Sequence, residues 1–360
     1  MAIAYELVPE ELNLRNPAFV GAFMGFPDAS MGASGAVRFL VETLQAAPLA
    51  TWDGDEFYDF GELRPVSRVV PPRDRALIWP QADFWVVRAA PGPPGAAGAG
   101  ETAPSRSLIL FLAHEPRLKW KTYSRELGEF ARRCGVTQAV FFGSAFADIP
   151  HTRPPIITGW ATEPRLRTRL EALGVPFSAY QGPSSMQSAA IEGFRGLDIP
   201  CASLFSNGPH YLPVPNANLS LALLRRLSGV LNVHLDLAPL QEAGETLVQQ
   251  ATAAMEERPE FRDHVRQLEA RFDEQAAPLA PGEVRRQEER RSQEERSGPL
   301  NVDPQDVVRE LEDFLRKRGR EQRGPSDSGT GGESPSGPSG PEGPPGPSGP
   351  TSPDGGPERL

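Results

Sequence analysis

The sequence predicts an α/β fold in which a mainly parallel β-sheet is covered by helices on both faces. Short apolar runs typical of buried strands recur within residues 18–205, and segments with apolar residues at helical spacing lie between several of them. Strands that alternate with helices favour parallel pairing, because a parallel connection needs a long crossover and the crossover helices cover the sheet. After residue 231 only the helical periodicity continues, which indicates a helical extension of the α/β core.

Each expected element has its own apolar pattern. The strand-like runs are residues 18–24, 75–79, 84–88, 107–112, 139–142, 156–160 and 201–205. The helical segments are residues 34–44, 119–134, 163–173 and 217–231, with apolar side chains gathered on one face. Because only a short turn containing Pro80 separates residues 75–79 from residues 84–88, we expect these two strands to form an antiparallel hairpin.

The chain divides into regions of different composition. We expect an α/β core domain at residues 1–235, in which residues 91–104 form a flexible insertion because they contain no apolar residue larger than alanine. Two amphipathic helices in residues 236–276 are expected to pack on the core. Beyond them we predict a charged linker (277–300), a C-terminal docking helix (301–320) and a disordered tail rich in Gly, Pro and Ser (321–360).

Composition disfavours several classes of protein. The net charge of −10 argues against nucleic-acid binding, since phosphates require a basic face. No run approaches the roughly 20 apolar residues that span a bilayer, and the N-terminus lacks a signal-peptide pattern, so we expect a cytoplasmic protein without a membrane partner. Cys134 and Cys201 lie in apolar surroundings and have no second Cys or His at ligand spacing, which predicts reduced core thiols and no metal. No dinucleotide fingerprint or phosphate-loop pattern is present, so we expect no cofactor.

A stiff polar loop follows the strand at residues 139–142. It contains Asp148, His151 and Arg153 among three prolines, which restrict the backbone. The three side chains have the chemistry of an acid/base pair and an anion clamp. The favoured interpretation is structural, with Arg153 paired with Asp148 and His151 bonded to a backbone carbonyl.

Three histidines follow three different expected strands. His114, His151 and His210 each lie just beyond a strand end, and this pattern suggests a common site or metal pocket. The alternative is that each histidine serves a separate hydrogen-bonding role. No catalytic nucleophile is recognisable, because the chain lacks a Gly-x-Ser-x-Gly elbow.

Two further loops contain residues that could bind an ion. The glycine-rich loop that enters the first helix is a potential anion loop, formed by Gly25, Asp28, Ser30, Gly32 and Gly35. The favoured alternative is a tight turn with a Ser or Asp helix cap. The acidic loop at residues 52–60 contains Asp53, Asp55, Glu56 and Asp59, which are oxygen ligands for a divalent cation. The favoured alternative is a solvated loop anchored by Phe57 and Tyr58.

Several segments, in order along about residues 17–275, carry a resemblance to a known family. They are Asp55-Glu-Phe-Tyr-Asp-Phe60, Ile78-Trp79-Pro80, Glu115-Pro116 with Lys119-Trp120, residues 148–154, Tyr180-Gln-Gly-Pro183, Pro209-His210-Tyr211 and residues 215–224. In this order and spacing they resemble the proteasome assembly chaperone 2 family. Ser184-Ser185-Met186 departs from the pattern, because the family often has Thr-Gly after Gly182-Pro183.

The resemblance implies a three-layer α/β/α fold similar to the nucleoside phosphorylase and hydrolase class. It also implies homo-oligomerisation, as a trimer, and protein partners related to the proteasome. It supplies no catalytic residues. The motif positions that it marks as interface or ligand residues are Asp55, Tyr58, Asp59, Trp79, Glu115, Trp120, Asp148, His151, Arg153, Gly182, Pro183, His210 and Tyr211.

We therefore predict a homo-oligomeric interaction protein of the assembly-chaperone type, without established catalysis. The alternative is a protein that binds a nucleoside- or phosphate-containing small molecule, or a hydrolase or phosphorylase. Its site would be the crevice at the carboxyl ends of the strands.

Overall fold

An eight-stranded mixed sheet forms the centre of the structure, a computed structural model that describes residues 3–5, 12–90, 106–256 and 259–276. In spatial order its strands are β1 (Ile3–Tyr5), β3 (Ala47–Asp53), β6 (Gln81–Ala90), β7 (Arg106–His114), β2 (Ala18–Met24), β8 (Gln138–Ala147), β10 (Cys201–Pro209) and β9 (Ile156–Ala161). The four strands β7, β2, β8 and β10 are mutually parallel. The strands on either side of this group pair in antiparallel fashion.

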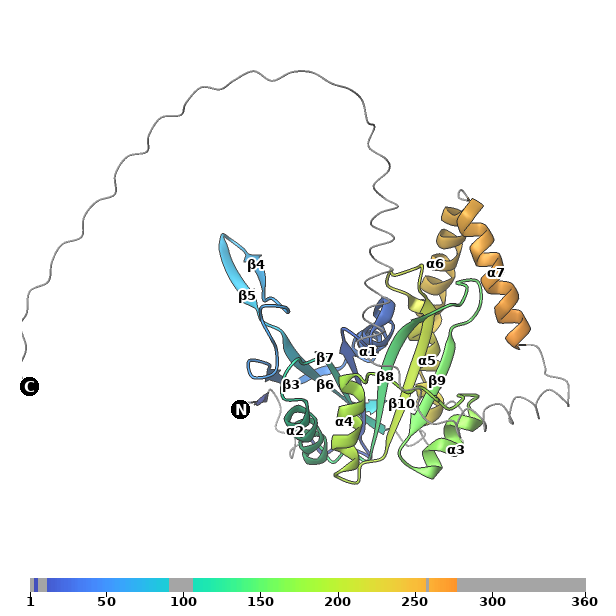
Figure 1. The fold of residues 1–360 in the computed structure, drawn as a ribbon. Helices are drawn as coiled ribbons and strands as arrows, with labels where there is room; N and C mark the ends of the chain where they lie inside the picture. Colours follow the sequence, from blue (N-terminus) through green and yellow to red (C-terminus); the bar gives the residue numbers. More distant parts are fainter. Residues whose placement is uncertain (1–2, 6–11, 91–105, 257–258, 277–360) are drawn as a thin grey trace, which may run out of the picture. The chain divides into compact units, whose positions relative to one another are not determined.

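Helices cover both faces of the sheet (Figure 1). Successive residues of β2 point to opposite faces, so Ala18 and Val20 join one hydrophobic cluster while Phe19 and Phe23 join the other. The first cluster includes residues of α1 (Gly32–Thr43), α3 (Pro164–Ala172) and α5 (Ala217–Leu231). The second includes residues of α2 (Trp120–Arg133) and α4 (Met186–Arg195). The predicted three-layer α/β/α fold is confirmed.

The layer formed by α2 and α4 is rich in aromatic side chains. The ring of Phe19 lies 5.6 Å from Phe111, 5.5 Å from Phe141 and 5.1 Å from Phe194. The two helices can approach closely because α4 contains Gly193: a Cβ atom there would lie 2.4 Å from the backbone oxygen of Ser124. Cys134 and Cys201 are both buried in this layer and form no disulfide.

A two-stranded hairpin projects from the sheet (Figure 1), and it differs from the predicted one. It consists of β4 (Val66–Val70) and β5 (Asp74–Ile78), whereas β6 pairs with β3 and β7 in the main sheet. The expected pairing of residues 75–79 with residues 84–88 is therefore wrong. The sequence concealed β4 because prolines flank the run at Pro65 and Pro71. Every residue of the hairpin strands is exposed.

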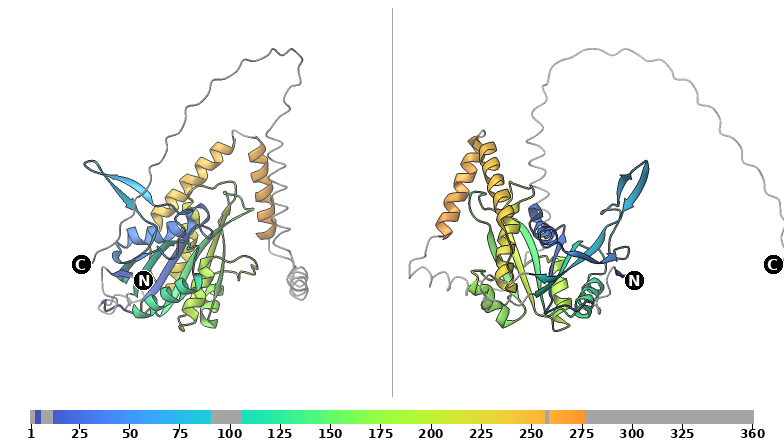
Figure 2. Two further views of the ribbon diagram at one scale, coloured as in Figure 1. Left: turned by 60° about the vertical axis from the view of Figure 1, so that its left-hand side comes forward. Right: turned by 180° about the vertical axis from the view of Figure 1, so that it is seen from behind.

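Two helices extend the core beyond α5 (Figure 2). Helix α6 (Ala238–Glu256) packs against α5, and α7 (Pro259–Ala276) folds back against α6. Val265 and Leu268 of α7 are buried. The domain division at residue 235 remains a prediction. The expected insertion, linker, docking helix and tail, at residues 91–104, 277–300, 301–320 and 321–360, lie outside the described residues.

Candidate functional site

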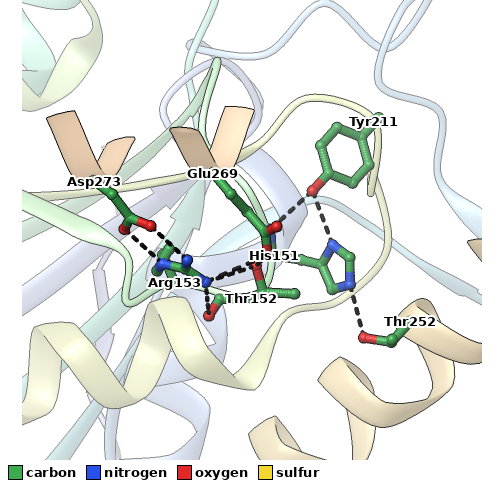
Figure 3. A network of polar contacts seen from close by, with 7 residues as sticks. All are labelled: His151, Thr152, Arg153, Tyr211, Thr252, Glu269 and Asp273. Carbon is green, nitrogen blue, oxygen red and sulfur yellow. Dashed lines mark hydrogen bonds and ion pairs between the residues drawn. The ribbon is translucent and has the colours of Figure 1, made fainter. Parts of the chain in front are cut away.

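The loops after β8 and β10 lie together at the carboxyl edge of the sheet. They meet because β8 and β10 are parallel neighbours, with Ala147 opposite Pro209 at their ends. His151, which is only 7% exposed, lies between the two loops and α6 (Figure 3). Its backbone N–H donates to the hydroxyl of Tyr211 at 2.8 Å, and its Nδ1 lies 2.9 Å from the same hydroxyl. Its Nε2 lies 3.1 Å from the hydroxyl of Thr252 in α6.

Arg153 joins the same loop to α7. Its Nε and Nη2 donate to the two carboxylate oxygens of Asp273 at 2.8 and 2.7 Å, a bidentate geometry. Its Nη1 lies 3.3 Å from Glu269, whose carboxylate also accepts a hydrogen bond from Thr152 (Figure 3). The residues His151, Thr152, Arg153, Tyr211, Thr252, Glu269 and Asp273 form what we call the anchor network. It fixes α6 and α7 to the strand ends.

The partners that the sequence analysis predicted for Asp148, His151 and Arg153 within their loop are wrong. Asp148 pairs with Nδ1 of His210 at 3.1 Å, and Arg153 reaches α7 instead. His151 bonds to two hydroxyl groups and to no backbone carbonyl. The reason is that α7 supplies two carboxylates one helical turn apart, Glu269 and Asp273, which match the fork of a guanidinium.

The anchor network favours a neutral His151. The hydroxyl oxygen of Tyr211 accepts a hydrogen bond from the backbone N–H of His151, so the hydroxyl proton of Tyr211 can be donated to Nδ1 of the imidazole. The proton of the neutral imidazole is then on Nε2, which donates to the hydroxyl of Thr252. Burial lowers the pKa of His151, and the charge of Glu269 opposes this effect. Asp273 and Glu269 raise the pKa of Arg153, which stays charged. Neither side chain is available to a ligand in this arrangement.

The neutral imidazole predicts that docking of α6 and α7 weakens in mild acid. In the unfolded chain His151 has an ordinary pKa of about 6.5, and the folded value is lower. Its contribution to stability is thus present above about pH 6.5 and is lost as the pH falls through the folded pKa. Hydrogen-exchange protection factors in α6 and α7 should fall between about pH 7.5 and about pH 5.5. Equal protection at both pH values would contradict the assignment of a neutral His151. Because glutamine does not titrate, the His151→Gln variant should show no difference in protection between the two pH values.

The three histidines predicted to converge do not all meet. His151 and His210 both lie against Tyr211, with ring centroids 5.9 and 5.6 Å away. His264 of α7 joins them, 6.0 Å from the Tyr211 ring. His114 lies instead at the end of β7, opposite Met24. Within the described ranges no group of three or more His, Cys, Asp or Glu side chains could hold a metal ion.

A cavity of about 630 Å³ opens at the carboxyl edge of the sheet, between the loop after β2 and the ends of β8 and β10. We call it the β2–β8 pocket. From β2 the chain continues to β3 on one side of the sheet, and from β8 it continues to β9 on the other, so the pocket lies where the topology reverses. Its aromatic lining residues are Phe26, Phe146, Tyr180 and Phe205. Its polar lining consists of serine, threonine and asparagine side chains and Asp28, with no Lys, Arg or His among the described residues.

In the loop from Gly25 to Gly35, the carboxylate of Asp28 occupies the backbone amides that an external anion would need. One carboxylate oxygen of Asp28 accepts the backbone N–H groups of Ala33 and Ser34 at 3.0 and 2.9 Å, in the first turn of α1. Burial raises the pKa of Asp28. The positions of Gly32 and Gly35 serve helix packing: a Cβ at Gly32 would lie 2.7 Å from the Cβ of Leu219 in α5. These contacts favour the helix-cap alternative over an anion loop.

Ser30 and the Gly182-Pro183 motif position the walls of the pocket. The hydroxyl of Ser30 donates to the backbone oxygen of Leu212 at 3.1 Å, which ties the β2 loop to the segment after β10. The hydroxyl of Tyr180 donates to the backbone oxygen of Pro183 at 3.1 Å. Pro183 lines the pocket and Gly182 does not.

The acidic loop is organised by turns and by buried aromatic rings. Asp53 accepts the backbone N–H of Asp55, and Asp59 accepts that of Gly61. The buried Tyr58 donates its hydroxyl to the backbone oxygen of His114, which fixes the loop to β7. These bonds agree with the solvated, anchored loop that we favoured.

The remaining motif residues support local structure. Trp79, half exposed, packs its ring 4.9 Å from Phe60. Glu115 accepts the backbone N–H of Met186 at 2.6 Å, at the first residue of α4. Trp120 donates its indole N–H to the backbone oxygen of Pro116. Each contact either holds motif residues against one another or binds the first turn of a helix.

Sequence comparison identifies the family of the chain. A family profile described as the PAC2 family matches residues 22–255. The chain belongs to the PAC2 family. No curated protein matches this PAC2 family member. None of its described helices is both long and apolar enough to cross a membrane.

Solved structures agree with this assignment. A PAC2 family protein from Streptomyces avermitilis is 29% identical, with a TM-score of 0.60, and the match covers 69% of this chain and 99% of that one. A proteasome-assembly chaperone homologue from Mycobacterium tuberculosis is 31% identical, with a TM-score of 0.59 and the same coverage. The archaeal proteasome activator PbaB from Pyrococcus furiosus shares the fold, at 13% identity and a TM-score of 0.53 over 70% of this chain and 98% of that one. The relatives support a chaperone-like family role for this PAC2 protein.

The residues of α6 and α7 that complete the site were not among those expected from the sequence. Thr252, Glu269 and Asp273 are more than 95 positions from the loop that they bind. The four-residue spacing of Glu269 and Asp273 was a usable signal, since it places two carboxylates on one helix face. It did not indicate which cation they meet.

Proposed function

We propose that this PAC2 protein is a cytoplasmic, homo-oligomeric interaction protein that binds a protein partner at the β2–β8 pocket. The observation that carries the proposal is the aromatic rim of the pocket, where Phe26, Phe146 and Tyr180 are 70%, 46% and 68% exposed. Large exposed aromatic side chains around a concavity are typical of protein contact sites. The described lining has no basic side chain, so an apolar segment of the partner suits it better than an acidic one.

The anchor network supports an interaction role over turnover. His151 and Arg153, the groups with acid/base and anion-binding chemistry, are bonded to Tyr211, Thr252 and Asp273. We therefore assign the 148–155 loop to positioning α6 and α7. The names of the relatives from Mycobacterium tuberculosis and Pyrococcus furiosus, a proteasome-assembly chaperone homologue and a proteasome activator, support a partner related to the proteasome.

Polar substitutions on the rim are expected to abolish partner binding without unfolding the protein. Phe146→Ser and Tyr180→Ser remove apolar contact area from exposed side chains, so stability should change by no more than about 0.5 kcal/mol. Native mass spectrometry of the full chain, purified gently from its host, measures both oligomer and bound partner. Val214→Ser is the matched control, because Val214 is 40% exposed and does not line the pocket. Equal partner recovery with rim and control variants would refute this site.

A second function is favoured by the polar lining of the same pocket. Thr158, Ser178, Ser184 and Asn207 offer hydrogen-bonding groups beside the aromatic rings, an arrangement that suits an uncharged nucleoside. A phosphate-containing ligand has less support, because Asp28 occupies the amides of α1 and Arg153 is paired. A nucleoside at one hundred times its dissociation constant should stabilise the protein by about 2.7 kcal/mol in thermal unfolding. Absence of any shift with the four common nucleosides removes this candidate.

A further inference from the structure

A second cavity, of about 540 Å³, lies at the opposite edge of the sheet, where the parallel strands begin. Three arginines line it: Arg106 at the start of β7, and Arg165 and Arg169 on α3. The other lining residues are amides (Asn16, Gln138, Asn232) and apolar residues of α3 and α5. No carboxylate is among the described lining residues, in a chain whose net charge is −10. We call this cavity the arginine pocket.

The donors of the arginine pocket are only partly used. Arg106 donates to the backbone oxygen of Asn16 at 2.9 Å, to the hydroxyl of Thr137 at 3.3 Å and to the backbone oxygen of Leu231 at 3.5 Å. All three acceptors are uncharged. Arg169 directs Nε and Nη2 to the backbone oxygen of Gly229. Its Nη1 therefore remains available for another acceptor.

Two donors of the pocket have no partner among the described residues. The side chain of Arg165 makes no hydrogen bond or ion pair there. The Nε2 atom of Gln138 is buried from solvent and also lacks a hydrogen-bond partner within the described ranges. A buried amide donor without an acceptor is costly, so it indicates an acceptor that comes from outside these residues.

A purely structural role explains part of the cluster. Arginines near a helix C-terminus satisfy its last carbonyl groups, and Arg106 and Arg169 do so at the end of α5. That role leaves Arg165 and the Gln138 amide unexplained. It also leaves the half-buried Arg106 without a counter-charge among the described residues, and burial lowers the pKa of its guanidinium.

We propose that the arginine pocket binds a small molecule that carries at least two phosphate charges, such as a diphosphate group. Guanidinium groups match phosphate oxygens with paired N–H donors, and three of them suit a ligand with several negative charges. One phosphate group carries about −1.5 to −2 charges at neutral pH, so a diphosphate balances the cluster. The Gln138 amide supplies one further donor to a phosphate oxygen. The site lies at the edge of the sheet opposite the β2–β8 pocket and is independent of it.

Pyrophosphate is the probe that tests the proposal. Isothermal titration calorimetry on the full chain, at constant ionic strength, should show one pyrophosphate site per chain that binds more tightly than citrate. Arg165→Ala should weaken binding about tenfold or more, because it removes a charged donor. Since Arg165 is exposed and makes no described bond, this variant should fold normally, which its thermal unfolding curve checks.

The matched control is Arg167→Ala on the same helix. It removes the same charge from α3, but Arg167 does not line the pocket and donates to the backbone oxygen of Ala161. Binding by this variant should equal that of the unaltered chain. Three results would overturn the proposal: no pyrophosphate binding, equal weakening by both substitutions, or citrate binding as tight as pyrophosphate binding.

Discussion

Replacing His151 with alanine is expected to weaken the attachment of α6 and α7 to the carboxyl edge of the sheet. The substitution leaves the hydroxyl groups of Tyr211 and Thr252 without their imidazole partner in a largely buried place. Losing one partner of a buried hydrogen bond costs about 1–3 kcal/mol, so the free energy of unfolding should fall by that amount. Hydrogen exchange should become faster across α6 and α7 before the sheet is affected.

His234→Ala is the matched control, because it removes a histidine that makes no contact in the anchor network. His234 is exposed and lies outside the anchor network, so its removal should change stability by less than about 0.5 kcal/mol. If His151→Ala leaves the exchange of α6 and α7 unchanged, the anchor network does not hold these helices. If the variant stays folded and oligomeric while an enzymatic activity disappears, the proposed interaction role is wrong.

Gly193→Ala is expected to destabilise the whole α/β core. A Cβ atom at this position would lie 2.4 Å from the backbone oxygen and 2.7 Å from the carbonyl carbon of Ser124, so α2 and α4 must move apart. Alanine is favoured over glycine in a helix interior by about 1 kcal/mol, but this gain is smaller than the expected strain. Overpacking typically costs about 1–3 kcal/mol, and the aromatic layer under both helices would be disturbed. Urea denaturation should show a lower midpoint with an unchanged slope.

Gly196→Ala is the control for this prediction. It lies three residues later, at the end of α4, with a negative φ of −63°. A Cβ atom at this position would lie 3.5 Å from the backbone oxygen of Glu192, which is an ordinary contact distance. The free energy of unfolding of the Gly196→Ala variant should therefore stay within about 0.5 kcal/mol of that of the unaltered chain. Equal effects of the two substitutions would show that the α2–α4 contact is looser than the structure indicates.

The layer architecture was predictable from the sequence because it depends on local apolar patterns. Seven runs indicated strands, and the helices α1, α2, α3 and α5 were recognised from their apolar faces. Strands β1, β3 and β4 and helix α4 escaped. Strand β3 begins at Ala47-Pro48, and proline lowers the expectation of a strand. Helix α4 directly follows Gly182-Pro183-Ser184-Ser185, a composition typical of a loop, and it contains Gly193, which is unfavourable in a helix interior.

The candidate site was less predictable because its contacts join distant parts of the chain. The sequence marked His151 and Arg153 as unusual, and their nearest charged neighbour in sequence, Asp148, was the natural partner to assume. The true partner of Arg153, Asp273, is 120 positions away. Likewise Asp28 could be recognised as a helix cap, but the depth of the β2–β8 pocket depends on three loops that only the tertiary structure brings together.

The position of Asp273 gives the anchor network a mechanical role. This residue lies in the last turn of α7, so its bond to Arg153 lies close to the point where the chain leaves the described structure at Ala276. A pulling force on the segment that follows would be borne first by the guanidinium–carboxylate pair, which transmits the load to the loop between β8 and β9. The turn between α6 and α7 is thereby relieved of tension. A partner that draws on the C-terminal segment would thus pull directly on the edge of the central sheet.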